Sequence, residues 1–213
     1  MLDHSVLKPE ATDMEILAGI DVVASLKIGF YCVQPCWVKL AAGMLAGANA
    51  TVVSVVGFPH GCDRPDVKAR AAAIAVAEGA GEIDMVLNFG ALKSGDSTLV
   101  AMEIENVVRA VQGIPVKVIL ETATLSQSEK LLACRLAMEG GAAFVKTSTG
   151  FHPIGGATAA DVRLLRAAVG SKLGVKASGG IRNLADAQAM IAAGANRIGT
   201  SASGAILSGL EEK

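Results

Sequence analysis

The sequence predicts a single α/β domain over residues 1–213, in which parallel strands alternate with helices to form a closed (β/α)8 TIM barrel. Short runs rich in Val and Ile recur along the chain, with longer Ala-rich segments between them. Successive runs begin at residues 52, 83, 116, 143, 173 and 197, so the unit repeats every 24 to 33 residues. No linker interrupts this series, which indicates one βα unit repeated within one domain.

The apolar runs are too short for helices and too continuous for strands with only one buried face. Both properties indicate parallel strands that are buried on two faces. The opening residues supply the first strand, and the later runs supply seven more. We therefore expect strands at residues 1–6, 28–33, 52–57, 82–87, 115–121, 143–147, 173–178 and 197–200.

The Ala-rich segments between the strands are expected to be helical. Several of them end in glycine just before the next strand, as at Gly79, Gly141 and Gly194. Glycine readily adopts the left-handed conformation that ends a helix. We expect helices at about residues 12–26 and at residues 67–78, 126–139, 159–168 and 184–192.

A doubly wound open sheet is the alternative arrangement of the same units. It would place a Gly-x-Gly-x-x-Gly turn or another phosphate loop after the first strand, and the sequence has neither there. The closed barrel is therefore favoured.

Charge and composition exclude several functional classes. Nineteen Lys and Arg residues oppose 20 Asp and Glu residues, so there is no positive field for nucleic acid or an anionic membrane. The longest uncharged stretch, residues 40–62, is interrupted by glycine, proline and polar residues, unlike a membrane-spanning helix. Charged residues follow the first Met almost at once, which is unlike a secretory signal, and we expect a cytoplasmic protein.

The cysteine and histidine pattern does not suggest a metal site. The four cysteines form no Cys-x-x-Cys pair, and the three histidines lie far apart in the sequence. A zinc site would need clustered ligands. We expect free thiols, no metal and no cofactor.

Charged residues interrupt four of the apolar strands: Asp84, Lys117, Lys146 and Lys176. One interpretation is structural, with Asp84 paired to one lysine and Glu121 to another. The other is catalytic, because inward-pointing side chains of barrel strands converge and catalytic groups gather at the C-terminal face. The occurrence of such residues on four strands favours the catalytic interpretation.

A cluster of lysines indicates amine chemistry. Two ammonium groups that lie close together repel each other, so one of them loses its proton more easily. A neutral lysine inside a barrel suggests Schiff-base formation with a carbonyl substrate. These considerations leave open which lysine is the nucleophile.

Glycine-rich turns after the last two strands suggest an anion site. Gly179 and Gly180 follow the strand that contains Lys176, and residues 199–203 lead from the last strand into a short helix. Glycines let backbone N–H groups approach an oxyanion, and a helix N-terminus favours negative charge. Phosphate binding at this position is common in barrels. The turn at residues 147–150 adds further donors.

Five segments together resemble the deoxyribose-phosphate aldolase family, in order from residue 3 to about residue 205. The most specific pair is Lys-Thr-Ser-Thr-Gly at residues 146–150 with Lys-Ala-Ser-Gly-Gly at residues 176–180. The other segments are residues 3–9, 56–61 and 82–88.

The resemblance implies a (β/α)8 class I aldolase of deoxyribonucleotide catabolism. Its reaction is the reversible cleavage of 2-deoxy-D-ribose 5-phosphate to acetaldehyde and D-glyceraldehyde 3-phosphate. The expected partners are these small molecules, with no nucleic acid and no membrane. We also expect a homo-oligomer, either a dimer or a tetramer.

The resemblance also implies roles for individual residues. Lys146 matches the Schiff-base lysine, Lys176 the second lysine that helps the first to lose its proton, and Asp84 the aspartate that relays protons with water. The remaining matches bind phosphate (Thr149, Gly179, Gly180 and Ser201) or line the pocket (Asp3 and Cys32). Lys117, singled out by its place in an apolar strand, is a further candidate pocket residue.

Two other functions remain open at this point, and two features depart from the family. The alternatives are another phosphosugar aldolase or transaldolase, and a non-catalytic barrel that binds phosphosugars. Phe151 stands where some members carry lysine, so phosphate affinity is expected to depend mainly on backbone donors. Only two residues precede Asp3, and we expect a poorly anchored first strand.

Overall fold

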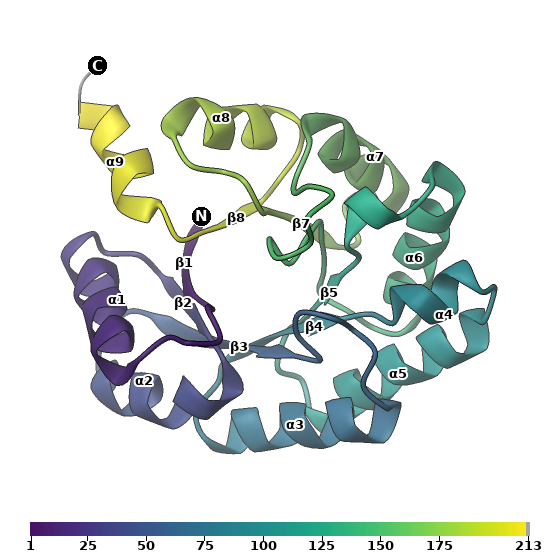
Figure 1. The fold of residues 1–213 in the computed structure, drawn as a ribbon, viewed down its shortest axis with the longest axis horizontal. Coiled ribbons are helices and arrows are strands. Elements are labelled where there is room, and N and C mark those ends of the chain that lie inside the picture. Colours follow the sequence, from purple (N-terminus) through teal and green to yellow (C-terminus); the bar gives the residue numbers. More distant parts are fainter. Residues whose placement is uncertain (212–213) are drawn as a thin grey trace.

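A computed structural model describes residues 1–211 of the chain. Within these residues the strands form a closed parallel barrel, each paired with the next along the chain and the last paired with the first. Figure 1 shows the strands at the centre of a ring of helices. The predicted barrel is therefore confirmed. The strands are β1 (Leu2–Val6), β2 (Phe30–Val33), β3 (Thr51–Val56), β4 (Glu82–Val86), β5 (Val116–Ile119), β6 (Phe144–Lys146), β7 (Gly174–Ser178) and β8 (Arg197–Thr200).

The helices pack around the outside of the barrel. The expected helices are all present, with ends within two residues of the predicted ones, and some further helices were not predicted. One of these is α5, whose buried residues Val100, Ile104 and Val107 lie at helical spacing. The α-helices are α1 (Asp13–Ser25), α2 (Val38–Met44), α3 (Pro65–Ala77), α4 (Phe89–Lys93), α5 (Ser97–Ala110), α6 (Gln127–Glu139), α7 (Ala159–Val169), α8 (Leu184–Ala192) and α9 (Ser203–Glu211).

Local sequence signals fix the helix ends. Thr12 and Ser126 each form a capping box with the glutamate three residues later, which satisfies free N–H groups at the start of α1 and α6. Gly79, Gly141 and Gly194 have φ values of 111°, 79° and 111° just after α3, α6 and α8. The prediction that these glycines end helices is confirmed.

Strand β1 is paired along both edges. His4 lies opposite Tyr31 of β2, and Asp3 lies opposite Gly199 of β8. The expectation of a poorly anchored first strand is therefore wrong. The hydrogen bonds of the strand come from its own backbone, so the number of residues that precede it does not weaken the pairing.

The barrel interior is unusually rich in charge. The main apolar core lies between the strands and the helices, whereas Cys32, Val53 and Val55 belong to a much smaller second cluster. Val53 and Val55 are in register with Glu82 and Asp84 of β4, so these side chains share the inner face of the sheet.

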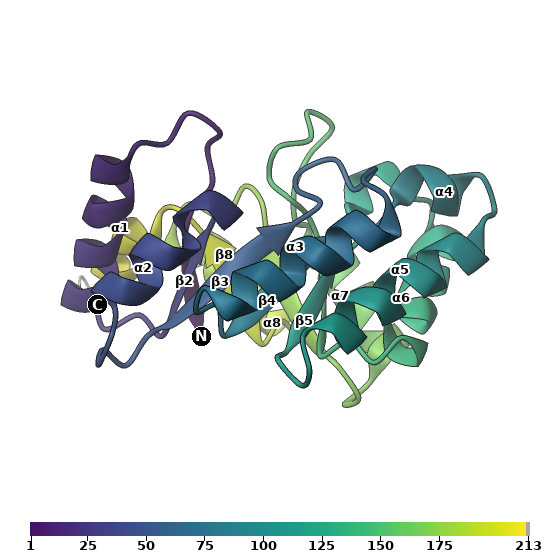
Figure 2. The same cartoon turned by 90° about the horizontal axis from the view of Figure 1, so that it is seen from below.

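In Figure 2 the loops that follow β1, β3 and β6 rise on one side of the barrel, above the C-terminal ends of its strands. Active sites of this architecture lie at that end.

Candidate active site

Asp84 on β4 is the centre of the buried charge cluster. Its Oδ1 lies 2.7 Å from Nζ of Lys117, and its Oδ2 lies 2.8 Å from Nζ of both Lys146 and Lys176. The three lysines come from β5, β6 and β7, and all four side chains are buried. The predicted convergence of these residues is therefore confirmed.

Glu121 has a different partner from the one expected. Within residues 1–211 it forms no ion pair with a lysine. Instead it accepts a hydrogen bond from the hydroxyl of Thr149 and lies 3.3 to 3.4 Å from the Thr149 backbone nitrogen. The Glu121–lysine pair of the structural interpretation is therefore absent from residues 1–211, because Glu121 follows β5 and faces the turn after β6 instead of the lysine cluster.

Lys176 is held as a cation by two carboxylates. Its ammonium group binds Asp3 of β1 as well as Asp84. Burial by itself would lower the pKa of Lys176, but Asp3 and Asp84 outweigh burial and raise it. Burial would likewise raise the pKa of Asp84, but the ammonium groups, led by Lys117, hold that pKa well below its usual range.

Lys117 lies deeper in the barrel than the other two lysines. Besides Asp84, its Nζ contacts Oε2 of Glu82 at 2.6 Å. Glu82 in turn lies 3.1 Å from a guanidinium nitrogen of Arg197, whose central carbon is 3.4 Å from the ring centroid of Phe30. Sequence reasoning missed Glu82 and Arg197. The available signal for Glu82 was its position two residues before Asp84, which places both side chains on one face of a strand.

A cavity of about 630 Å³ opens at Lys146 and Lys176. Asp3 and Cys32 also line it, as predicted. Lys117 does not line it and is fully buried, so the expectation that Lys117 is a pocket residue is wrong. The physical reason is depth: Lys117 points below Asp84, towards Glu82, while the other two lysines lie on the cavity side.

Cys32 is a buried thiol on β2. Burial, with smaller contributions from Asp84 and Asp3, raises its pKa to about 12. The thiol therefore keeps its proton at neutral pH and is a poor nucleophile.

Backbone N–H groups gather at the C-terminal ends of β7 and β8. Gly179 and Gly180 have φ values of 90° and 81°, which favour glycine. A Cβ at Gly179 would lie 3.1 Å from Cα of Gly156 and 3.2 Å from Cα of Gly150, so close packing also requires glycine there. Ser201 lines the cavity two residues before the start of α9. These residues are brought together as predicted.

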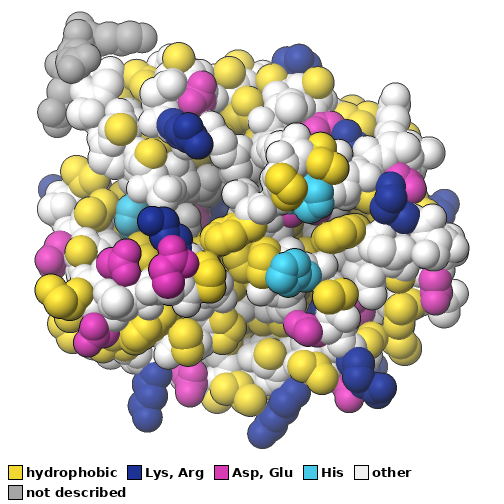
Figure 3. All heavy atoms as spheres, in the orientation of Figure 1, with side chains coloured by type: hydrophobic (Ala, Val, Ile, Leu, Met, Phe, Trp, Pro, Cys, Tyr) yellow, Lys and Arg dark blue, Asp and Glu magenta, His cyan; other side chains and the backbone are white. Residues whose placement is uncertain are grey.

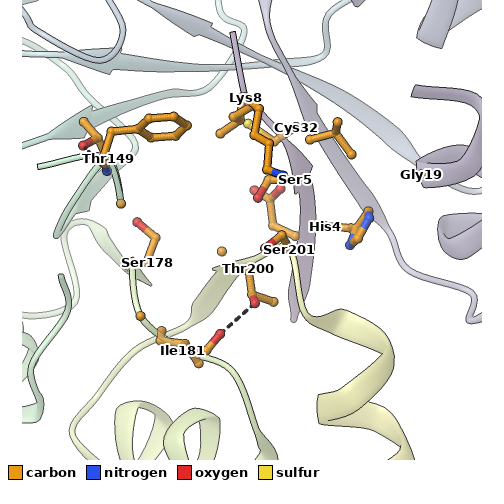
Figure 4. A pocket seen from close by; sticks show the side chains of 18 of the residues that line it. His4, Ser5, Lys8, Gly19, Cys32, Thr149, Ser178, Ile181, Thr200 and Ser201 are labelled. Atoms are coloured by element: carbon orange, nitrogen blue, oxygen red, sulfur yellow. Dashed lines mark hydrogen bonds between the residues drawn. The ribbon is translucent and has the colours of Figure 1, made fainter. Parts of the chain in front are cut away.

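Figure 4 shows how the cavity wall is arranged. Thr149 and Ser178 lie on one side, and Ser5 and Ser201 lie on the other. The Thr200 hydroxyl donates a hydrogen bond of 2.8 Å to the carbonyl of Ile181, which fixes the turn beside Ser201.

Thr149 lines the cavity, but its hydroxyl already has two partners. It donates to Glu121 and accepts a hydrogen bond from the backbone nitrogen of Phe151 at 3.1 Å. Glu121 has a left-handed backbone with φ of 56°, an uncommon conformation for a residue with a side chain. Glu121 and Thr149 together therefore shape the turn that follows β6.

The rim of the cavity is aromatic. Phe151 lines it and packs edge-on against Phe58, with ring centroids 5.2 Å apart. Figure 3 shows hydrophobic side chains and histidine around the middle of this face of the molecule. Phe151 is 42% exposed, so an uncharged ring faces solvent at this edge of the cavity.

Residues 1–211 contain no group of three His, Cys, Asp or Glu side chains arranged as metal ligands. No helix in this range is both long enough and apolar enough to cross a bilayer.

Comparison with known proteins agrees with this geometry. A family model described as DeoC/LacD family aldolase matches residues 3–209. The chain is 51% identical over 210 residues to a deoxyribose-phosphate aldolase of Enterococcus faecalis, covering 98% of this chain and 95% of the relative.

Solved structures of two aldolases are also similar. The aldolase QR15 superposes with a TM-score of 0.94 at 40% identity, covering 99% of this chain and 94% of that one. The tetrameric deoxyribose phosphate aldolase of Aeropyrum pernix superposes with a TM-score of 0.90 at 30% identity, covering 99% of this chain and 89% of that one.

Proposed function

The chain belongs to the DeoC/LacD family of aldolases, and we propose that it cleaves 2-deoxy-D-ribose 5-phosphate to acetaldehyde and D-glyceraldehyde 3-phosphate through a Schiff base on Lys146. The observation that supports this most directly is the position of Lys146. Its Nζ lies at the cavity, 2.8 Å from a carboxylate oxygen that it shares with a second lysine.

Lys146 is the best candidate nucleophile of the three lysines. Lys117 does not reach the cavity. Lys176 binds two carboxylates, which favour its charged form. Among residues 1–211, Lys146 pairs with Asp84 alone and shares the contacted oxygen with Lys176. A free amine, which Schiff-base formation requires, is therefore least costly at Lys146.

The reaction begins with attack of the free Lys146 amine on the aldehyde carbon of the open-chain sugar. The resulting carbinolamine loses its hydroxyl as water, with a proton supplied through Asp84, and an iminium ion remains. Asp84 can act as this relay because its Oδ2 contacts Nζ of both Lys146 and Lys176.

Carbon–carbon cleavage follows from the iminium ion. A base removes the proton of the C3 hydroxyl, the C2–C3 bond breaks, and its electron pair moves towards the iminium nitrogen to give an enamine. D-Glyceraldehyde 3-phosphate leaves, the enamine is protonated at C2, and water releases acetaldehyde from Lys146. The positive charge of Lys176 beside Lys146 disfavours a second cation and so favours the neutral amine at the start of the cycle.

The phosphate group is proposed to bind at Gly179, Gly180 and Ser201. All three residues line one cavity, and Ser201 lies two residues before the N-terminus of α9, which favours an anion. Thr149 contributes by holding its turn in shape through Glu121. Phe151 offers the phosphate no charge, whereas the cationic Lys8 and Arg182 also line the cavity.

Trapping with sodium borohydride in the presence of acetaldehyde tests this proposal. Reduction should add one two-carbon unit to the peptide that contains Lys146, as detected by mass spectrometry. An adduct on Lys176 or Lys117 in the wild-type protein would overturn the assignment. Absence of any adduct, with no cleavage of the sugar, would support a non-catalytic barrel, and a preference for dihydroxyacetone over acetaldehyde as donor would indicate a different aldolase.

We also propose that the protein is a homo-oligomer. The similarity to the tetrameric aldolase of Aeropyrum pernix supports this. Light scattering coupled to size-exclusion chromatography would give the mass directly, and a mass of about 21.6 kDa, that of one chain, would contradict the proposal.

A further inference from the structure

A second ion pair lies at the end of the barrel away from the cavity. Glu82 and Arg197 are the first residues of β4 and β8, and their side chains are 3.1 Å apart. Both are at least nine-tenths buried, and neither lines the cavity. The reaction proposed above gives this pair no role.

The pair is connected to the reaction centre by an unbroken series of close contacts. Glu82 contacts Lys117 at 2.6 Å, and Lys117 contacts Asp84 at 2.7 Å. Asp84 contacts Lys146 and Lys176, and Lys176 contacts Asp3. We call these seven residues the barrel ion cluster: Asp3, Glu82, Asp84, Lys117, Lys146, Lys176 and Arg197.

The charges of the barrel ion cluster balance when Lys146 is neutral and its other six residues carry their usual charges. Without Lys146, the cluster holds three cations (Lys117, Lys176 and Arg197) and three anions (Asp3, Glu82 and Asp84). A proton on Lys146 therefore adds one unmatched positive charge to a region shielded from water. Such a charge is costly where the dielectric constant is low.

Other groups near Lys146 do not alter this balance. Cys32 on β2 stays neutral because its pKa is raised to about 12. Strand β3 contributes Val53, Val55 and the uncharged Ser54. His4 of β1 is hydrogen-bonded to Ser203 away from the cluster, and burial lowers its pKa, which favours the neutral ring. Glu121 is directed to Thr149 and is not part of the series of ion pairs.

We propose that Glu82 and Arg197 are positioning residues that set the charge balance of the barrel ion cluster, and thereby the pH at which Lys146 becomes a free amine. This inference rests on the proposed role of Lys146 as the nucleophile. Neither residue touches the substrate cavity, and both act through Lys117 and Asp84.

Two substitutions break the same ion pair from opposite sides and separate this role from a structural one. Glu82→Gln removes an anion, so the cluster gains positive charge and Lys146 loses its proton at lower pH. Arg197→Gln removes a cation, so Lys146 retains its proton to higher pH. The acidic limb of the kcat/KM profile should therefore move to lower pH in Glu82→Gln and to higher pH in Arg197→Gln. Each shift should be about one pH unit, the effect of a charge about 10 Å away at an effective dielectric constant of about 20.

Rescue and double variants complete the test. Glu82→Asp and Arg197→Lys keep the charges, so each should leave the limb near its wild-type position. The double variant Glu82→Gln with Arg197→Gln removes one charge of each sign, so its limb should also lie near the wild-type position. Thermal melts record the cost in stability, which both single variants share.

The sign of the shift decides the outcome. If both single variants melt earlier and their limbs stay in place or move the same way, the pair is purely structural and the inference fails. Each variant has its own expected sign, so one folded variant is enough for a decision. Failure of the proposed function is distinguishable, because it would appear as a missing or misplaced borohydride adduct in the wild-type protein.

Discussion

Lys146 and Lys176 lie opposite each other on neighbouring strands, and their ammonium nitrogens are both 2.8 Å from one oxygen, Oδ2 of Asp84. One carboxylate oxygen thus contacts two lysine nitrogens. Asp3 provides additional negative charge for Lys176 only. The two lysines are therefore electrostatically unequal, although they are neighbours in register and face the same cavity.

Replacement of Lys176 tests this inequality. Lys176→Leu removes the neighbouring positive charge, so kcat/KM at pH 7 should fall by at least about 10-fold through the loss of charge repulsion between the two amines. Activity should partly return at about pH 9 to 10, where an unaided lysine begins to lose its proton. A pH–rate profile measures both effects. Lys176→Arg keeps the charge and should preserve the position of the acidic limb.

A control variant and a contradicting result complete the Lys176 test. Asp84→Asn removes the proposed proton relay, so it should show no alkaline recovery. A Lys176→Leu protein that melts much earlier, with a uniformly low profile at every pH, would contradict the electrostatic role. Such behaviour would instead indicate a purely structural ion pair, whose rupture costs about 3–5 kcal/mol of stability.

Ser201 allows a direct test of the phosphate site. Ser201→Glu places a carboxylate beside the proposed phosphate, so KM for deoxyribose 5-phosphate should rise at least about 10-fold by charge repulsion. KM for unphosphorylated deoxyribose should change much less. Ser201→Gln is the matched control, since it has nearly the same size without the charge. Equal losses on both substrates in steady-state kinetics would place the phosphate elsewhere.

The Thr149–Glu121 hydrogen bond should matter for both stability and substrate binding. Thr149→Val removes the hydroxyl that donates to the buried Glu121 carboxylate, and the free energy of unfolding should fall by about 1–3 kcal/mol. The loosened turn should also raise KM for the phosphorylated substrate. Denaturant unfolding and kinetics measure the two effects. Thr149→Ser retains the hydroxyl and should rescue both, whereas an equally stable Thr149→Val protein would contradict the role of this bond.

The buried ion pair between Lys68 and Glu103, which is separate from the barrel ion cluster, should stabilise the loop after β3. Lys68 contacts Glu103 at 2.6 Å and donates to the carbonyls of Gly61 and Val86. Lys68→Met leaves the Glu103 carboxylate buried without its cation, so stability should fall by about 3–5 kcal/mol.

A double-mutant cycle checks this expectation. Burial raises the pKa of Glu103, although Lys68 opposes the increase. Without Lys68 the pKa should rise further, so the stability lost in Lys68→Met should be partly regained as the pH falls and Glu103 takes up a proton. The double variant Lys68→Met with Glu103→Gln should be more stable at neutral pH than Lys68→Met alone. Additive losses in the two single variants would show that the pair is not coupled.

The sequence by itself determined the barrel and most of its reactive groups. Strands buried on two faces require continuous apolar runs, so their number and spacing are visible in the sequence. Lys117, Lys146 and Lys176 stand out for the same reason, because a charge within an apolar strand is rare. The glycines after the helices and at 179–180 are equally visible, since their positive φ values favour glycine.

Only the tertiary structure decided how these groups are paired. Asp3 and Lys176 are 173 residues apart in the sequence, and Glu82 and Arg197 are 115 apart. The alternation of side chains along a strand predicts which of them face the barrel interior, but it does not predict how far each lies from the cavity. Depth separates Lys117, which points to Glu82, from Lys146 and Lys176, which reach the cavity. Ion pairing depends on distances of a few ångströms between strands that meet only when the barrel closes, and the closed barrel therefore determines which lysines reach the cavity.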